Sequence, residues 1–264
     1  MKMHEDPPAV ISHPAHPAHM LTLVTITTAS GDPPFRCDGC KEPGSGTGRR
    51  YRCSDDGCDF DLHTCCALAS PTLKNHPLLG DDLAFTLLPD GAPPVAGDAA
   101  AACVACGGAT EGLVYYYCSV DSKKKDLYLH PCCAAMRTES VLAGVHRVQL
   151  CTEAKLRCAV CGEKKEHGHG HHHFFSSGRK LWAYRWLYGG EEGYLHVGCM
   201  KKIAVLSWEQ ECDVDGGAAV MEASVPILKG LLLRRREKES ELVSNGIEIG
   251  NSIAEAVSAA ATSS

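Results

Sequence analysis

Short apolar segments alternate with stretches rich in glycine, proline and polar residues along the 264-residue chain. The segment 21–28 (LTLVTITT) is β-branched and ends at a Ser-Gly-Asp turn, which predicts a strand. Three further short strands are expected at 51–53, 115–118 and 181–188. Strands this short favour small β-hairpins over one large sheet.

Stretches that permit a short helix occur at 67–69, 134–137 and 200–207. We therefore expect one short helix beside each group of hairpins. Near the C-terminus, the segment 226–243 has the pattern of an amphipathic helix with a basic cluster at 234–236, which could touch anionic lipid or act as a nuclear signal. A solvated, partly helical or disordered tail is the simpler interpretation, because charge runs at chain ends usually stay in water.

The run His-x-x-Cys recurs three times, beginning at His63, His130 and His196, so successive copies lie 67 and 66 residues apart. A Cys-x-x-Cys pair precedes each copy, and a fixed period of this kind indicates tandem copies of one unit. Each copy carries three thiols and one imidazole, a complete tetrahedral zinc set. The predicted segments are a flexible leader, three small zinc-stapled α+β modules and a tail, at 1–12, 13–78, 79–146, 147–212 and 213–264.

The composition suits small metal-stapled units. Modules of roughly 60 residues build marginal cores and usually need a metal or disulfides. Only 6% of the residues are aromatic, and the chain has 26 glycines and 14 prolines. The sequence also lacks a Ser-His-Asp, Walker or HExxH pattern, so we expect that the chain is not an enzyme.

Sixteen cysteines suggest either disulfides or metal ligands. Residues 1–19 hold four prolines and four histidines but no apolar stretch of signal-peptide length, so we expect an unsecreted chain in the cytoplasm, the nucleus or both. Thiols stay reduced there, which favours metal ligation.

The net charge of −6 argues against a nucleic-acid partner, and no apolar run is long enough to span a membrane.

The candidate ligands fall into sets. The second module offers one set: Cys103, Cys106, His130 and Cys133. The third module offers another: Cys158, Cys161, His196 and Cys199. The first module offers a double set: His19, Cys37, Cys40, Cys53, Cys58, His63, Cys66 and His76. That double set implies two zinc ions, but spacing alone leaves its pairing open.

The first module also resembles a known family. The string HPAHML…FRCDGC…YRCSDDGCDFDLHTCCAL…NHPL is similar to the plant divergent C1 domain family, the Cys/His-rich relatives of the protein kinase C zinc domain. The aromatic-Arg-Cys segment, the CDFDLHxxC core and the closing His-Pro carry the resemblance. It extends over about 13–200, strongly in the first module and weakly in the third.

This resemblance implies two interleaved sites in the first module. One joins the first cysteine pair to the His-x-x-Cys run: Cys37, Cys40, His63 and Cys66. The other joins the second pair to a leading and a closing histidine: Cys53, Cys58, His19 and His76. His13 and His16 compete with His19, but each precedes proline, which suits a solvated linker. The chain departs from the family in that four residues, not two, separate the second pair.

The second site is incomplete in the later modules. In the second module Cys118 remains, but its partner position is Asp121, and only His146 could add a ligand. In the third module the strand 181–188 (LWAYRWLY) stands in place of the middle cysteine pair, and we expect its aromatic side chains to replace the lost metal as a staple. We therefore expect four zinc ions, or five if the Cys118 remnant binds one.

Other cysteines and histidines fit no set. Cys65 and Cys132 directly precede ligand cysteines, and we expect them, like Cys151 and Cys212, to be spare thiols. The insert 167–173 (HGHGHHH) could bind a metal loosely, but its glycines favour a mobile loop.

These features predict a non-enzymatic zinc-binding adaptor in intracellular signalling or stress response that binds a protein partner. A first alternative is lipid recognition, because protein kinase C-type C1 domains bind diacylglycerol between two apolar loops. The loop after Cys40 lacks the apolar tip that entry into a bilayer needs. A second alternative is thiol redox activity, but a redox Cys-x-x-Cys usually sits at a helix N-terminus.

Overall fold

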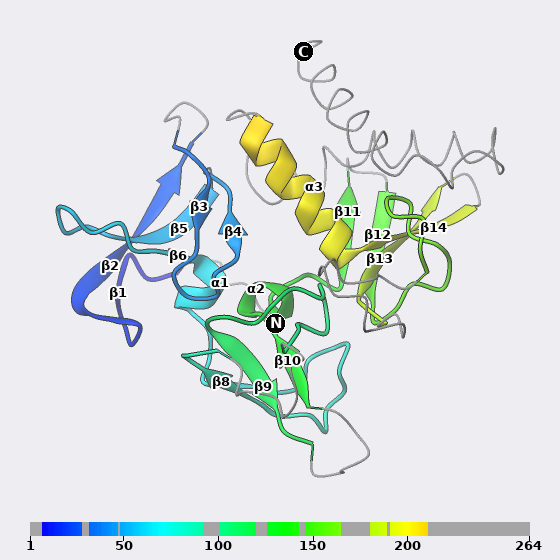
Figure 1. Cartoon of the computed structure of the whole chain (residues 1–264), viewed down its shortest axis with the longest axis horizontal. Coiled ribbons are helices and arrows are strands. Elements are labelled where there is room, and N and C mark those ends of the chain that lie inside the picture. Colours follow the sequence, from blue (N-terminus) through cyan, green and yellow to red (C-terminus); the bar gives the residue numbers. More distant parts are fainter. Residues whose placement is uncertain are drawn as a thin grey trace. The chain divides into compact units, whose positions relative to one another are not determined.

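A computed structural model describes residues 7–27, 32–46, 48–91, 101–119, 126–142, 146–164, 180–188 and 191–210. The chain divides into two compact units, one made of 1–104 and 108–137 and the other of 105–107 and 138–264 (Figure 1). The predicted tail, the first half of the leader (residues 1–6), the His-rich insert, Thr28, Asp121 and Cys212 lie outside the described residues. The end of the leader is part of the strand β1 (Val10–His13), contrary to the expected boundary at 12/13.

The first unit begins with a four-stranded antiparallel sheet, here the first sheet, in the order β1-β2-β5-β6. Its strands are β1 (Val10–His13), β2 (His16–Ile26), β5 (Gly48–Cys53) and β6 (Asp61–His63). A small hairpin of β3 (Phe35–Arg36) and β4 (Pro43–Gly44) carries the first Cys-x-x-Cys turn between β2 and β5. The short helix α1 (Thr64–Ala67) follows β6 directly.

The second sheet has the order β10-β9-β8-β7. Its strands are β7 (Thr72–Leu73), β8 (Phe85–Leu88), β9 (Val114–Tyr117) and β10 (Leu127–Leu129). The helix α2 (Pro131–Ala134) follows β10. Because β7 pairs with β8, Thr72 and Leu73 lie in the second sheet, although the expected boundary at 78/79 assigns them to the first module.

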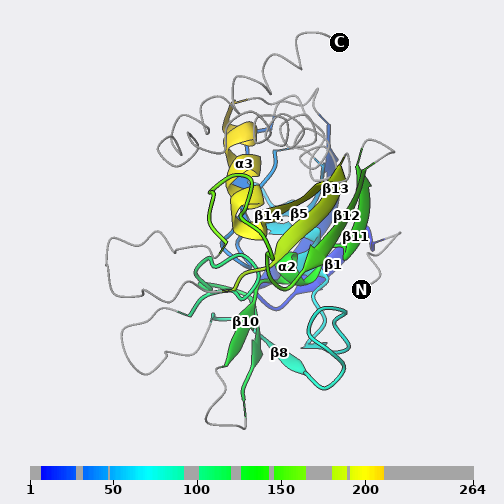
Figure 2. The ribbon, with the colours of Figure 1, turned by 90° about the vertical axis from the view of Figure 1, so that its right-hand side faces the viewer.

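The second unit contains the third sheet, in the order β11-β12-β13-β14. Its strands are β11 (Glu139–Leu142), β12 (His146–Cys151), β13 (Ala183–Tyr188) and β14 (Glu191–His196). Figure 2 shows β11, β12 and β13 side by side, with α3 (Val197–Gln210) rising from the end of β14. As in the first and second sheets, the first two strands form a hairpin, β11 with β12, and the second strand of this hairpin also pairs with the next strand, β13.

One pairing recurs in all three sheets. The leucine before the His of each His-x-x-Cys run lies opposite a tyrosine of the neighbouring strand, and all six side chains are buried: Leu62–Tyr51, Leu129–Tyr115 and Leu195–Tyr184. Side chains alternate between the two faces of a strand. Residues at the same distance from this Leu–Tyr pair therefore lie on the same face in each of the three sheets.

The prediction of small β-rich modules with short helices and Cys/His clusters is confirmed. The predicted positions of the first two helices are wrong, because α1 and α2 begin directly after His63 and His130 instead of after the following cysteine. Pro131 suits the first position of a helix, where its missing N–H has no partner to lose. No helix in the described ranges has the length and apolar character needed to cross a membrane.

Candidate metal centres

Four groups of Cys and His side chains each bring four potential ligand atoms within 4.8 Å of one another. Site 1 is formed by Cys37, Cys40, His63 and Cys66. Site 2 is formed by His16, His19, Cys53 and Cys58. Site 3 is formed by Cys103, Cys106, His130 and Cys133. Site 4 is formed by Cys158, Cys161, His196 and Cys199. Sites 1, 3 and 4 contain the residues that the sequence groups together.

The cysteine pairs of sites 1, 3 and 4 sit in the same kind of tight turn, which we call the knuckle. In each knuckle the N–H of the first cysteine donates to the carbonyl five residues later, at 2.8–3.0 Å: Cys37 to Glu42, Cys103 to Gly108 and Cys158 to Glu163. The residue after the second cysteine has a positive φ in all three, at Lys41, Gly107 and Gly162. This turn aims both sulfurs at one point, as a metal requires.

At site 1 the His63 ring faces the sulfurs through Nδ1, which lies 3.4 Å from Cys40 Sγ and 3.9 Å from Cys66 Sγ. Its other nitrogen, Nε2, lies 3.2 Å from the Pro43 carbonyl oxygen. A hydrogen bond to that carbonyl places the proton on Nε2 and leaves Nδ1 free to bind a metal. The His63 backbone N–H also donates to Cys37 Sγ at 3.4 Å, which steadies the first sulfur.

The side chains of site 1 strongly perturb one another's protonation. Hydrogen bonds with Cys40 and Cys66 hold the pKa of Cys37 well below its usual range. Burial lowers the pKa of His63, but the hydrogen bond and charge of Cys37 outweigh burial and raise it to about 10. Without a metal, this raised pKa favours a proton on Nδ1 as well, and a metal has to displace that proton. Because protons compete with the metal, acid should weaken binding at this site.

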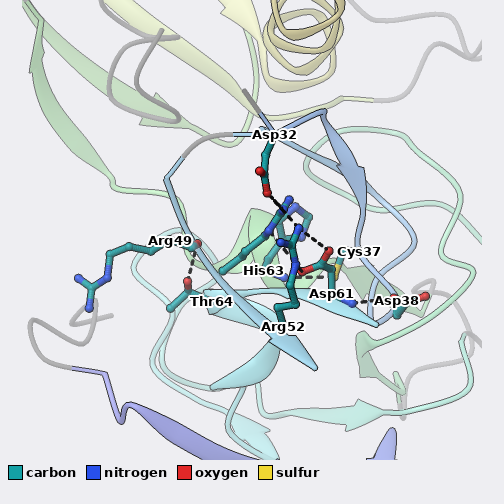
Figure 3. A network of polar contacts seen from close by, with 9 residues as sticks. Asp32, Cys37, Asp38, Arg49, Arg52, Asp61, His63 and Thr64 are labelled. Carbon is teal, nitrogen blue, oxygen red and sulfur yellow. Dashed lines mark hydrogen bonds and ion pairs between the residues drawn. The ribbon is translucent and has the colours of Figure 1, made fainter. Parts of the chain in front are cut away.

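A network of charged residues supports the site 1 knuckle (Figure 3). The Asp38 N–H donates to the Asp61 carbonyl at 2.8 Å, and the Asp61 N–H donates to the Asp38 carboxylate at 2.9 Å. Arg52 Nε lies 3.2 Å from the Asp61 carboxylate. These contacts tie the knuckle to β6, the strand that ends at His63.

Site 2 differs from the set implied by the family resemblance, because the structure does not bring His76 to it. His16 stands there instead, with Nε2 3.4 Å from Cys53 Sγ and 3.5 Å from Cys58 Sγ. His19 presents Nδ1 at 3.5 Å from Cys53 Sγ, and its Nε2 lies 3.6 Å from the Asp55 carboxylate. The repeated His-Pro-Ala-His spacing of the lead-in is the sequence signal that could have pointed to His16.

His76 instead makes its hydrogen bonds beside the second sheet. It is buried between β7 and β8, where Nδ1 accepts the Leu78 N–H at 3.2 Å and Nε2 lies 3.3 Å from the Ala134 carbonyl at the end of α2. His13 is the last residue of β1 and makes the same kind of contact, because its Nδ1 accepts the Ala15 N–H at 3.2 Å. The closing His-Pro of the first module is therefore the leading His-Pro of the next hairpin.

Replacing His16 and His76 separately distinguishes the two assignments. We expect His16→Ala to lower the bound zinc by one ion per chain, because it removes a site 2 ligand. His76→Ala should keep all the zinc but lower the free energy of unfolding by about 1–3 kcal/mol, since buried polar partners lose their hydrogen bond. Native mass spectrometry and thermal unfolding measure the two effects. Loss of zinc from His76→Ala alone would restore the assignment implied by the resemblance.

Sites 3 and 4 share the ring orientation of site 1. His130 Nδ1 lies 4.0 Å from Cys133 Sγ, while Nε2 lies 2.8 Å from the Ala109 carbonyl and 3.4 Å from the Glu42 carboxylate. His196 Nδ1 lies 3.4 Å from Cys161 Sγ, and its backbone N–H donates to Cys158 Sγ at 3.4 Å. Its buried Nε2 has no hydrogen-bond partner in the part of the chain that the structure describes.

In the second and third sheets, which have no counterpart of site 2, an aromatic residue occupies the position of Cys53. Cys53 of site 2 lies two residues beyond Tyr51 on β5, and the matching positions are Tyr117 on β9 and Trp186 on β13. Tyr117 packs against Phe85 with ring centroids 5.6 Å apart, and Trp186 is buried. Cys118 lies one residue after the position that corresponds to Cys53, and it is exposed. It belongs to none of the four groups found among the described residues.

The donor sets fit zinc. Sites 1, 3 and 4 offer three sulfurs and one nitrogen, and site 2 offers two of each, which are the usual ligand sets of structural Zn²⁺. In sites 1, 2 and 3 the second nitrogen of a ligand histidine faces a carbonyl or carboxylate oxygen, as it does in established zinc sites. Each group could therefore hold one zinc ion.

A family match covers the part of the chain that contains sites 1 and 2. Residues 14–67 match the family model of the C1 domain. The match contains all eight residues of sites 1 and 2. Neither the curated proteins nor the solved structures include a match to the chain.

Proposed function

We propose that the chain is a non-enzymatic zinc-binding protein made of three tandem C1-like modules, because residues 14–67 match the family model of the C1 domain and the same geometry recurs further along the chain. It acts as an intracellular adaptor in signalling or stress response, in the cytoplasm or nucleus, by binding other proteins. The observation that carries this proposal is the set of four compact Cys/His groups, each with four ligands.

Repeated geometry supports the three modules. The buried Leu–Tyr pair, the knuckle hydrogen bond and the positive φ recur in the first, second and third sheets. A further hydrogen bond also recurs, from the residue after the first knuckle cysteine to the strand that precedes the His-x-x-Cys run: Asp38 to Asp61, Val104 to Tyr128 and Ala159 to Tyr194. Four shared features at a period of 66–67 residues favour duplication of one unit.

The ligand count supports a structural role for the metal. A zinc ion held by four protein ligands has no open position for water or substrate. It therefore cannot generate a metal-bound nucleophile, which needs such a position. In this proposal the four zinc ions stabilise small folds, and the protein surfaces of these folds bind the partner.

Lipid recognition is the weaker alternative. The first of the two loops that correspond to the lipid-binding loops of protein kinase C-type C1 domains is tied to the strand β5, because the Asp32 carboxylate pairs with Arg50 at 2.8 Å and Arg52 at 3.2 Å. Among the described residues, the exposed large apolar side chains are Val10, Met20, Leu156 and Leu187, and none lies in these loops. Entry into a bilayer needs apolar area that the described residues of these loops do not offer.

Thiol redox catalysis is disfavoured by where the cysteine pairs sit. All three knuckles are turns, and the helices begin later, at Thr64, Pro131 and Val197. The lowered thiol pKa of a redox pair usually comes from a helix N-terminus. In these knuckles each cysteine pair faces a histidine and a third cysteine, which is a metal-binding arrangement.

Zinc content tests the proposal directly. We expect the reduced chain to carry four tightly bound zinc ions, one per site, and to unfold on chelation because metal binding supplies much of the folding energy of small zinc units. Native mass spectrometry gives the stoichiometry, and circular dichroism with a chelator follows unfolding. Two or fewer zinc ions in reduced protein would rule out the ligand assignment.

Partner binding separates the adaptor from the lipid hypothesis. We expect the zinc-loaded chain to capture a defined protein partner from cell extract under reducing conditions, and chelated protein to lose it. Vesicles of phosphatidylserine with diacylglycerol serve as the competing ligand. Sedimentation with these vesicles, without a zinc-dependent protein partner, would favour the lipid alternative.

A further inference from the structure

The site 1 knuckle is covered by the second module. The Leu113 N–H donates to the Gly39 carbonyl at 2.8 Å, and Leu113 is buried in the core of the first module. A Cβ on Gly39 would lie 2.7 Å from Leu113 Cδ1 and 3.0 Å from Leu62 Cδ2, so a larger residue there would force these side chains to shift. Both residues lie in the first compact unit, in which the two modules share one core.

Charged residues join the same two modules beside the knuckle. Arg36 pairs with Glu111 at 3.1 Å on the surface. Glu42, two residues after the knuckle, lies 3.4 Å from Nε2 of His130, a site 3 ligand. The helices α1 and α2 lie side by side between the first and second sheets (Figure 1). The second module is therefore held against site 1 at several points.

Cys132 brings a fifth thiol to site 1 across this contact. It is the second residue of α2, is half-buried and packs against the core cluster that contains Cys37, Cys40 and Cys66. Its thiol lies within interaction range of the Cys40 thiol and of the His63 ring. Cys40 is almost fully buried, so Cys132 is the more accessible sulfur of the pair.

We propose that Cys132 is a peroxide-sensitive thiol that forms a disulfide with Cys40 and thereby opens site 1. This inference rests on the zinc occupancy proposed above. Cys132 is neither a ligand of any of the four groups nor part of the known C1 match, which ends at residue 67. Its proximity to Cys40 arises only because the second module docks on the first.

The chemistry has two balanced steps. Hydrogen peroxide oxidises the Cys132 thiol to a sulfenic acid and is itself reduced to water. The Cys40 sulfur then attacks the sulfenic sulfur, the S–O bond breaks, and the hydroxide that leaves takes up a proton to become a second water. The new S–S bond removes Cys40 from the ligand set. Cys37, His63 and Cys66 remain, and three ligands make a poor structural zinc site.

Peroxide treatment of the zinc-loaded, full-length chain tests this. Zinc content is measured first, then zinc release is followed with a chromogenic chelator and disulfides are mapped by mass spectrometry of alkylated peptides. We expect release of about one zinc per chain together with a linked peptide pair that contains Cys40 and Cys132, both reversed by dithiothreitol and added zinc. Cys132→Ser should abolish the linked pair and slow the release at least about threefold.

Cys65→Ser is the matched control, because Cys65 holds the second position of α1 and is half-buried like Cys132 on α2. It should leave the Cys40–Cys132 link intact. Equal zinc release from Cys132→Ser, or a disulfide between Cys37 and Cys40 or between Cys65 and Cys132 in the unaltered chain, would overturn the proposal. Disulfide mapping of the unaltered chain decides the matter even if a variant folds poorly. A low zinc content before oxidation would count against the proposed function instead.

Discussion

Replacing Cys40 with alanine is expected to remove one zinc ion per chain and to unfold the first module. Cys40 is buried, and its sulfur lies 3.4 Å from His63 Nδ1 in site 1. Metal binding supplies much of the folding free energy of a small zinc unit, so the loss of one ligand affects the whole module. Because Leu113 of the second module sits on the same knuckle, we expect the disorder to spread into the second sheet.

Native mass spectrometry and hydrogen exchange measure this result. His63→Ala should behave like Cys40→Ala, since it removes another ligand of the same site. Cys65→Ala is the matched control, because Cys65 is adjacent to the ligand Cys66 but belongs to none of the four groups, and it should keep its zinc. If ligand and control variants resist a chelator equally, the separation of ligands from spare thiols is wrong.

Replacing Trp186 with alanine should lower the free energy of unfolding by about 3–5 kcal/mol, the usual cost of removing a buried tryptophan. Trp186 is buried on β13 and lies opposite Gly193 on β14, where a Cβ on Gly193 would overlap the indole ring. β14 ends at His196, a site 4 ligand. We therefore expect site 4 to lose zinc to a chelator faster, although Trp186 is not a ligand.

Thermal unfolding and competition with a chelator check this prediction in the full-length chain. Leu187→Ala is the matched control on the same strand, because Leu187 is 56% exposed and should change little. Trp186→Phe should retain most of the stability, since it keeps an aromatic ring and removes an indole N–H that has no partner among the described residues. Unchanged stability of Trp186→Ala, with loss of a protein partner, would show that the aromatic residues form a binding surface.

Much of the metal chemistry could be predicted from local spacing. A Cys-x-x-Cys turn aims two sulfurs at one point, and the cysteine of His-x-x-Cys stays close to its histidine, because three residues cannot carry them far apart. The period of the His-x-x-Cys run then predicted three similar units. Sites 3 and 4 come together as this spacing predicts, and site 1 comes together as the family resemblance implies.

The helix positions and the role of His76 could not be predicted in this way. The helices begin at the residue after the ligand histidine, where the strand before it ends, and that point depends on sheet pairing. The closing His-Pro has the same local sequence as a leading His-Pro. Only the pairing of β7 with β8 shows that His76 belongs to the hairpin of the second sheet and contacts Ala134 instead of Cys53.

The sequence by itself therefore determined the ligand types and the residues of sites 3 and 4, because each of these modules offers one Cys-x-x-Cys pair and one His-x-x-Cys run, while the residues of site 1 followed from the family resemblance. The tertiary structure alone decided that His16 completes site 2 and that Trp186 occupies the position of Cys53. It also placed Cys132 beside Cys40, two residues 92 positions apart in the sequence. Contacts of this range depend on strand register and on the docking of one module against the next, neither of which is encoded in any short motif.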